Sequence, residues 1–445
     1  MSRSFLVIGA GISGLCTAWF LKQRGHSVTL LETRDQAGGN IRTLHQDGYL
    51  IERGPNSTLN SRPALATLFE SLGISPLEAN KSSKKRYVLR DGSLHPLPMG
   101  PGDFIRTPLF SGAGKWRLLA EPFIGRAKEE ESVARFVERR LGQEFLNWAI
   151  NPFVSGVYAG DPEQLSARAA TAKVYALEKE YGSLMRGALA KILFHRHKGG
   201  AGPAGSMISF DAGMQVMTDT LGDRLGDALC TGVSVDILEQ TADGWCARAG
   251  EQQWSAEEVV LALPAKACAQ LLEPLLPALP ELFDAIPYPA VASVSLGFRK
   301  SQVAHPLDGF GFLIPRITGV ETLGVLFPSS VFPNRAPEGH CLLTAFIGGT
   351  LNPELADLGD DEVTRRVLRD IRPLLGIEGE PAVISVNRWR EAIPQYTLGH
   401  LERLASIDGL LKSLPGLHTR ANWREGISVA DCVQNAFDFA QRQGV

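Results

Sequence analysis

The chain has 445 residues, of which 44% are apolar and 21% are charged, and its formal net charge is −3. This length predicts about two to four domains. The charge is uneven, because residues 81–200 carry 20 Lys and Arg against 12 Asp and Glu, a local balance of +8. No nucleic-acid recognition motif accompanies this basic segment, so we do not expect a nucleic-acid partner.

The cysteines and the long uncharged segments argue against a metal-binding protein and against a membrane-spanning protein. The six cysteines are scattered without C-x-x-C spacing, which fits a reducing, cytoplasmic compartment and predicts no metal site. The longest uncharged segment, residues 4–21, has three glycines in its middle, and residues 145–160 contain asparagine, proline and glycine. Neither segment predicts a membrane span.

The first predicted unit is "FLVIGAGISGLCTAWFLKQRGHSVTLLE". It indicates a strand over residues 5–8, a helix over 13–23 and a second strand over 28–31 that ends at Glu32. A glycine turn of the form G-x-G-x-x-G lets a pyrophosphate approach the helix N-terminus, and the acid accepts hydrogen bonds from ribose. We therefore predict a dinucleotide site whose turn consists of Gly9, Ala10, Gly11, Ile12, Ser13 and Gly14.

Two further glycine turns follow in "TRDQAGGNIRT" and "GYLIERGPNS". Their order resembles the FAD-binding fold of the flavin amine oxidase superfamily. In that arrangement Gly38-Gly39 lies against the diphosphate, and Gly54-Pro55 bends a strand end toward the isoalloxazine. The resemblance implies FAD contacts from Glu32, Thr33, Arg34, Gly39, Asn40, Gly54, Pro55, Asn56 and Ser57.

The basic segment opens with "KKRYVLRDGSLHPLP" (84–98), which predicts a hairpin with a turn at Asp91-Gly92. Apolar periodicity in "KWRLLAEPFIG" and "ESVARFVERRLGQEFLNWAI" then predicts helices. Two interpretations of the positive charge stay open. In the first, the helices touch the anionic inner face of a membrane without spanning it. In the second, the cations only surround the entrance for the substrate.

The remaining segments predict a discontinuous organisation. "KGGAGPAGS" (198–206) indicates a boundary, after which residues 213–227 predict a helix and residues 230–240 and 257–264 predict strands. Residues 265–400 alternate strands with a helix over 360–375. We expect an α/β protein with an α+β substrate part. Its predicted domains are a Rossmann-like FAD-binding domain (1–80, 201–264 and 401–445), a helical basic module (81–200) and a sheet-based substrate domain (265–400).

Longer motifs resemble the protoporphyrinogen oxidases, flavoenzymes of late haem synthesis, and occur in the order of that family. They are "GPNS" (54–57), "NPFVSGVYAGDPEQLSARAA" (151–170), "DGFGFLIP" (308–315), "IPQYTLGHLERL" (393–404) and "NWREGISVADCV" (422–433). The resemblance implies an oxygen-using oxidation of a porphyrinogen, in which FAD takes hydride from a methylene bridge and the protein positions the substrate in an apolar pocket.

The resemblance also implies FAD contacts from Val233, Trp389, Asn422, Gly426, Ile427, Ser428 and Val429. For Trp389, core packing is an equal alternative. Cys432 does not match the pattern of flavinylated relatives, so we expect non-covalent FAD.

The same resemblance implies the residues that position the substrate, which are Arg86, Phe310, Gly311, Leu313 and Phe346. Arg86 is expected to hold a propionate, because a guanidinium donates two parallel hydrogen bonds to a carboxylate. We expect Lys84, Lys85 and Arg90 to stay solvated. Phe312 stands where some relatives have histidine, so a polar role is not expected there. Phe346 stands where relatives often have methionine, and we expect it to form a hydrophobic wall.

Three alternatives remain open from the sequence. A coproporphyrinogen oxidase of the same fold would act on a substrate with four propionates and need a more basic pocket. An amine oxidase or desaturase of the superfamily would surround its substrate with paired aromatic side chains such as Trp389 and Tyr396. A flavin-binding scaffold without activity belongs to a third class.

Overall fold

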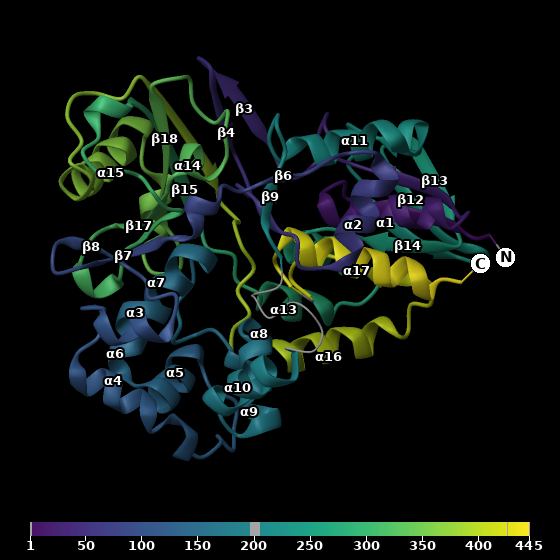
Figure 1. The fold of residues 1–445 in the computed structure, drawn as a ribbon. Helices are drawn as coiled ribbons and strands as arrows, with labels where there is room; N and C mark the ends of the chain where they lie inside the picture. The colour runs from purple at the N-terminus through teal and green to yellow at the C-terminus, as the bar shows by residue number, and fades with distance from the viewer. Residues whose placement is uncertain (1, 196–204, 425, 445) are drawn as a thin grey trace.

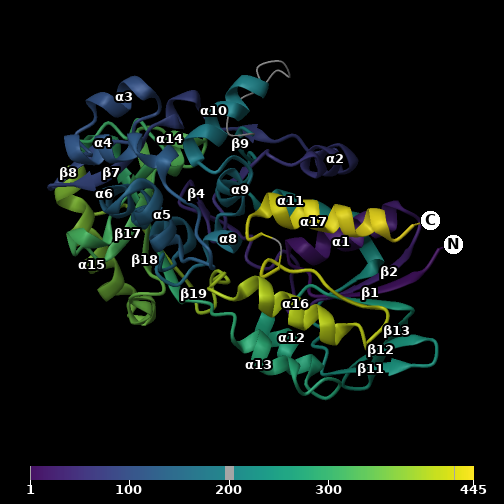
Figure 2. The same ribbon diagram turned by 90° about the horizontal axis from the view of Figure 1, so that it is seen from below.

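The computed structural model describes residues 2–195, 205–424 and 426–444. Its elements form three lobes (Figure 1). A lobe built on a parallel sheet lies on the right with both chain termini, the largest sheet lies at upper left, and a group of helices lies at lower left. In the view from below, the parallel-sheet lobe with both termini again lies on the right, and the seven-stranded sheet and α3–α6 lie on the left (Figure 2).

The first lobe contains a five-stranded parallel sheet in the order β10–β2–β1–β14–β20. Its strands are β10 (Leu229–Cys230), β2 (Ser27–Leu31), β1 (Ser4–Ile8), β14 (Glu258–Leu261) and β20 (Leu417–Thr419). Residues 5–8 of β1 are all buried because both faces of the sheet are covered, as is typical of parallel strands. Phe5 and Val7 enter one hydrophobic core, and Leu6 and Ile8 enter another.

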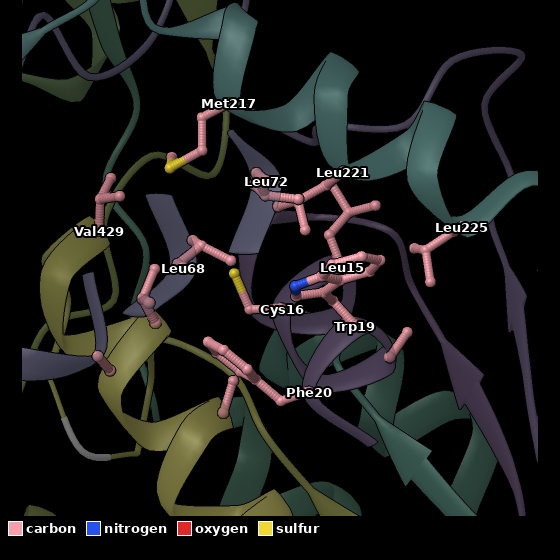
Figure 3. Close-up of a cluster of buried hydrophobic side chains, with 14 of the residues drawn as sticks. Leu15, Cys16, Trp19, Phe20, Leu68, Leu72, Met217, Leu221, Leu225 and Val429 are labelled. Carbon is pink, nitrogen blue, oxygen red and sulfur yellow. The ribbon is translucent and has the colours of Figure 1, made fainter. Parts of the chain in front are cut away.

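Helices cover one face of this sheet. They are α1 (Ile12–Gln23), α2 (Pro63–Leu72), α11 (Gln215–Leu225) and α17 (Val429–Arg442). Figure 3 shows how Trp19 of α1, Leu68 of α2 and Leu221 of α11 point toward one another in this core. The opposite face carries an antiparallel sheet of β11 (Ile237–Thr241), β12 (Gly244–Ala249) and β13 (Gln252–Ala256), with helices α12 (Ala265–Leu272), α13 (Leu279–Asp284) and α16 (His400–Leu411).

The second lobe contains a seven-stranded sheet in the order β19–β15–β18–β17–β16–β7–β8. Its strands are β19 (Val383–Trp389), β15 (Val291–Arg299), β18 (His340–Gly348), β17 (Thr322–Leu326), β16 (Gly311–Leu313), β7 (Arg86–Arg90) and β8 (Ser93–Pro96). Neighbours are antiparallel except β16 and β7, which are parallel. One face packs against α15 (Asp360–Leu375) in a core of its own, and α14 (Pro328–Val331) lies beside β18.

Two small sheets lie outside these layers. One is the hairpin of β3 (Thr43–Gln46) and β4 (Tyr49–Glu52). In the other, β9 (Met207–Ser209) pairs with both β5 (Thr58–Leu59) and β6 (Leu77–Glu78), so the chain after the boundary segment returns to the N-terminal unit.

The third lobe is helical. Its α-helices are α3 (Pro101–Arg106), α4 (Gly112–Leu119), α5 (Val133–Leu141), α6 (Gln143–Phe145), α7 (Asn151–Phe153), α8 (Ala167–Ala170), α9 (Ala172–Tyr181) and α10 (Leu184–His195), with π-helical turns at Leu146–Ile150 and Val154–Tyr158. At its centre the fully buried guanidinium of Arg140 pairs with Glu121 and Glu178. Buried charges require such partners. Among the described residues, no helix combines the length and the apolar character needed to cross a bilayer.

Most predicted elements are confirmed, including the helix at 360–375, but two segments lie outside the ranges predicted for their domains. The hairpin β7–β8 pairs with β16 in the seven-stranded sheet rather than joining the helical lobe. Helices α12 and α13 follow residue 264 and pack on the parallel sheet. Both depend on contacts with residues far away in the sequence. The functional roles of the predicted domains remain predictions.

Candidate functional site: a flavin cradle beside a half-apolar sheet face

The glycine turn after β1 leaves the N-terminus of α1 open. Gly9 has φ +100°, and a Cβ on Gly14 would lie 1.8 Å from the Gly9 carbonyl oxygen, so neither position tolerates a side chain. Gly11 is the N-cap residue of α1 and, having no side chain, caps none of the first helical N–H groups. A Cβ built on Gly11 meets no atom within 4 Å. The turn therefore offers free backbone N–H groups and unfilled space to an anion.

The second and third glycine turns fold onto the first. The Gly38 N–H donates to the Ala10 oxygen over 2.8 Å, and a Cβ on Gly39 would lie 3.0 Å from the Gly11 Cα. A Cβ on Gly54 would lie 1.9 Å from the Asn40 oxygen. Three segments that are separate in the sequence thus form one cradle of backbone without side chains, which fits the diphosphate of a dinucleotide.

Glu32 ends β2 and is almost fully buried beside this cradle. Its Oε2 accepts from the Ala10 N–H at 2.7 Å, and its Oε1 accepts from the Arg34 N–H at 3.0 Å. Each oxygen keeps a lone pair, so ribose hydroxyls can still donate to the carboxylate. The Val233 N–H donates to the Glu32 carbonyl oxygen, which brings Val233 to the same place. Thr33, in contrast, is exposed.

The C-terminal motif reaches the cradle through α17. Ser428 caps this helix, since its Oγ accepts from the Asp431 N–H at 3.1 Å, and Gly426 has φ +132°. Ile427 and Val429 flank the cap, and α17 packs along α1. A small cavity between these two helices is lined by Ser13, Thr17, Arg420, Ala421, Arg424, Cys432, Asn435 and Ala436.

Tyr396 holds this segment in place, a role that the sequence analysis did not assign. Its hydroxyl donates to the Asn422 oxygen at 2.5 Å and accepts from the Gly426 N–H at 3.0 Å. Its ring stacks on His400 with centroids 4.2 Å apart. Burial lowers the pKa of His400 to about 4, so the stacked imidazole is neutral. The "PQYTLGH" motif was the available signal, because it places both rings four residues apart.

Four of the five predicted substrate residues, Arg86, Gly311, Leu313 and Phe346, lie on one face of the seven-stranded sheet, and Phe310 directly precedes β16. Side chains alternate along each strand, and those on the α15 face are buried in a hydrophobic core. We call the other face the pocket face. Across the strands it presents Arg86, Val88, Gly311, Leu313, Gly324, Leu326, Thr344, Phe346, Ser293, Ser295, Ser385, Asn387 and Trp389. Its large apolar members Leu313, Leu326 and Phe346 are only partly buried, so this face keeps an apolar surface available.

The backbone of β16 requires glycine at position 311, so this position brings no side chain to the pocket face. Gly311 has φ +147°, and a Cβ there would lie 2.1 Å from the Val325 oxygen. Phe312 points the other way, is 2% exposed and packs near Phe327. From the helical lobe, Gly156 approaches Leu313 so closely that a Cβ would lie 2.5 Å from its Cδ2.

Arg86 is the cation of the β7–β8 hairpin that faces this surface. Its guanidinium lies over the Phe310 ring, 5.1 Å from the centroid, and donates to the Lys84 carbonyl oxygen at 3.4 Å. Arg86 forms no ion pair with any of the described residues. Desolvation by burial lowers the pKa of Arg86 from its usual value, although a guanidinium stays charged. An anionic ligand would supply the partner that this charge lacks.

The neighbouring cations differ from Arg86 in having partners. Lys85 pairs with Asp308, and Arg90 donates to Glu144 at 3.3 Å and lies 4.6 Å from the centroid of the Trp148 ring. The expectation that Arg90 is merely solvated is therefore wrong, because α6 supplies its acid. Lys84 is exposed, as expected.

The comparisons with known proteins agree with this geometry. The sequence model of the family described as "Flavin containing amine oxidoreductase" matches residues 12–442. The chain belongs to this family. The family establishes a flavin cofactor and an oxidoreductase activity, and it confirms the α/β fold class. The individual flavin and substrate contacts remain predictions.

Several relatives of this chain are named as porphyrinogen oxidases. The chain is 34% identical to a chloroplastic protoporphyrinogen oxidase of Nicotiana tabacum, over 98% of this chain and 84% of the relative. It is 30% identical to the coproporphyrinogen III oxidase of Bacillus subtilis, over 97% of this chain and 96% of the relative. A crystal structure from Exiguobacterium, provisionally assigned as a protoporphyrinogen oxidase, matches with a TM-score of 0.84 at 24% identity, covering 100% of this chain and 99% of that one.

Proposed function

We propose that the protein oxidises protoporphyrinogen IX to protoporphyrin IX with FAD as cofactor and molecular oxygen as electron acceptor. The observation that carries the proposal is Arg86, a half-buried cation without an acidic partner among the described residues, at the edge of the partly apolar pocket face. A flat apolar macrocycle with carboxylates on one side is complementary to this arrangement. The relatives named as protoporphyrinogen oxidases support it.

The cradle supports FAD rather than a mononucleotide. Three glycine turns offer backbone to a diphosphate, and Glu32 lies where an adenosine ribose would meet it. Non-covalent binding is supported by Cys432, which is buried and whose pKa is raised to about 11 by desolvation, so its thiol is not a ready nucleophile. Acid precipitation should therefore release all the yellow colour into the supernatant. Flavin retained in the pellet would contradict this.

The flavin supplies the hydride-accepting chemistry when it is bound. The chain's own residues position the substrate. Arg86 would hold a propionate through charge-assisted hydrogen bonds, while Phe310, Leu313 and Phe346 would contact the faces of the macrocycle and exclude water. Gly311 brings no side chain to this face, so the ring could approach its backbone.

Coproporphyrinogen III is the second candidate, because relatives of this chain carry that name. Its four propionates would need more free cations. In the segment from Lys84 to Arg90, Lys85 and Arg90 are occupied by acids, and Lys84 is exposed to solvent. Within this segment, Arg86 is the half-buried guanidinium that no acid among the described residues pairs with, which favours the substrate with fewer carboxylates.

Anaerobic bleaching of the yellow protein tests the assignment. Stopped-flow mixing with protoporphyrinogen IX, coproporphyrinogen III and a primary amine should bleach the flavin fastest with the first, and air should restore the colour. Faster bleaching by coproporphyrinogen would reassign the substrate, and bleaching by the amine alone would place the protein among the amine oxidases.

We also propose that the helical lobe contacts the inner, cytoplasmic face of an anionic membrane. Its large exposed apolar side chains include Met99, Ile105, Trp116, Leu119 and Phe123, and the last is 84% exposed. They lie on or next to α3 and α4, away from the parallel-sheet lobe in both views (Figures 1 and 2). Exposed apolar groups in a basic segment fit an interfacial contact.

Liposome flotation decides between this contact and cations that only surround the pocket entrance. The protein should float with anionic vesicles at low salt, less at high salt, and less again after the double change Trp116→Ser and Phe123→Ser. Exchange of the exposed Ile317→Ser in the sheet lobe serves as the matched control. Absence of lipid dependence at low salt would refute the membrane contact.

A further inference from the structure

The side-chain amide of Asn387 is a polar group that the proposed substrate contacts do not use. Asn387 lies on β19 on the pocket face, between Ser385 and Trp389. Its Nδ2 is enclosed, and within the described ranges it has no hydrogen-bond partner. Buried amide donors in proteins are nearly always paired, so an unpaired one directed at a binding face indicates a ligand acceptor.

One of the predicted flavin-contacting turns reaches β19 beside this amide. Arg53 directly precedes the Gly54-Pro55 turn, and its Nη2 donates to the Ser385 Oγ over 3.4 Å. Its Nε is also enclosed without a partner among the described residues. Ser385 is two residues from Asn387 and therefore on the same face of the strand.

A second predicted flavin-contacting segment is connected to the other end of β19. After Trp389 the chain leads to Tyr396, whose hydroxyl binds the Asn422 oxygen and the Gly426 N–H. Asn387 thus lies on the strand whose Ser385 contacts Arg53, next to the Gly54-Pro55 turn, and whose chain continues to Tyr396 and its contacts with Asn422 and Gly426.

The neighbours of Asn387 across the sheet show which ligand fits. Ser293 of β15 is directly opposite Asn387, and Phe346 of β18 is directly opposite Ser293. With Ser295 and Thr344, whose hydroxyls lie 3.1 Å apart, the β19–β15 side of the pocket face is polar. Leu326 and Leu313 make the other side apolar. The polar side suits the pyrimidine half of a flavin, which carries carbonyl and ring-nitrogen acceptors, whereas the apolar side suits the macrocycle.

We propose that Asn387 is a positioning residue that donates a hydrogen bond to a carbonyl of the pyrimidine half of the bound flavin and thereby raises its reduction potential. Reduction adds electron density to this half of the ring, so a fixed donor stabilises the reduced form more than the oxidised form. The inference rests on the flavin cofactor of the family and does not depend on which porphyrinogen is the substrate.

The test is the two-electron midpoint potential of the holoenzyme, measured by anaerobic reductive titration beside a reference dye. In Asn387→Leu the equilibrium constant for reduction should fall about tenfold, which is about 30 mV for a two-electron couple. Asn387→Asp preserves the volume but replaces the donor with a carboxylate, so its potential should fall further. If the Leu variant does not fold, the Asp variant decides alone.

Thr364→Val is the matched control, since the Thr364 Oγ1 is likewise enclosed and unpaired within the described ranges but lies on α15, against the opposite face of the sheet. Its potential should equal that of the wild type. Wild-type potentials in both Asn387 variants would overturn the proposal. If the potential is unchanged and only KM for the porphyrinogen rises, the amide binds substrate instead of flavin, and the proposal is equally refuted.

Discussion

The parallel-sheet lobe and the seven-stranded sheet build their halves of the site in different ways. The first uses backbone, because three glycine turns within residues 9–54 come together in a cradle whose shape depends on missing side chains. The second uses side chains from strands between residues 86 and 389, brought together only by strand pairing. A local motif can encode the first kind of site, whereas the second exists only after the chain has folded.

A side chain placed in the cradle should have the largest effect on flavin binding. Gly11→Leu should abolish flavin binding while the apoprotein still folds, because Gly11 has φ −69° and its Cβ would meet no protein atom within 4 Å. The flavin-to-protein absorbance ratio and a cooperative unfolding transition measure the two effects. Full flavin occupancy in the soluble variant would show that the diphosphate lies elsewhere.

Gly14→Ala is the contrasting control. Its Cβ would lie 1.8 Å from the Gly9 oxygen, so this change should prevent folding as well as flavin binding. If Gly14→Ala folds normally and Gly11→Leu does not, then Gly11 is the glycine that folding requires and Gly14 is the one that faces the ligand, the reverse of the expected roles.

This contrast also explains how much the sequence could predict. The dinucleotide turn, Glu32 and the helix at 360–375 follow from local patterns of glycine, charge and apolar periodicity. The partners of Arg90 could not be found in this way, since Glu144 is 54 residues away. The same holds for the pocket face, because β7 pairs in parallel with β16, which is more than 200 residues later. Arg86 was placed by resemblance, and no local pattern distinguished it from Lys85.

A second prediction concerns Glu52, which lies between the two lobes. Its carboxylate is buried and accepts from the Met214 N–H and the Thr43 hydroxyl, each at 2.8 Å, and desolvation raises the pKa of Glu52 to about 7. The folded state therefore holds the proton of the Glu52 carboxyl group more tightly than the unfolded state does. The contribution of Glu52 to the free energy of unfolding is complete below about pH 4.5 and is lost as the pH rises through about 7. By about 1.4 kcal/mol per pKa unit, the loss is about 3 kcal/mol.

Denaturant titrations at pH 5 and pH 8 measure this effect. Glu52→Gln keeps an uncharged acceptor, so the free energy of unfolding of this variant should depend on pH by about 3 kcal/mol less than that of the wild type. Glu70→Gln changes an exposed acid on α2 and should retain the wild-type dependence. Identical pH profiles for the wild type and Glu52→Gln would mean that Glu52 remains ionised in the folded protein.

In the half of the site that is built from side chains, Arg86 is the residue to change. Arg86→Ala should weaken porphyrinogen use and leave the flavin spectrum unchanged. Losing one charge-assisted hydrogen bond typically costs about 1.5–3 kcal/mol. If the contact is equal in the ground and transition states, the loss appears in KM. At about 1.4 kcal/mol per tenfold, KM should rise roughly 10- to 150-fold. Arg86→Lys should recover only part, because an ammonium lacks the two-pronged geometry.

The structure supplies better controls for this test than the hairpin sequence alone. Lys84→Ala removes an exposed cation two residues away and should leave KM near the wild-type value, because Lys84 contacts Arg86 only through its carbonyl oxygen. Arg90→Ala should instead lower the melting temperature, since it removes contacts with Glu144 and Trp148. Steady-state porphyrin fluorescence gives KM for each variant. A wild-type KM in Arg86→Ala together with a raised KM in Lys84→Ala would show that the substrate carboxylate binds at the exposed end of the hairpin, outside the pocket face.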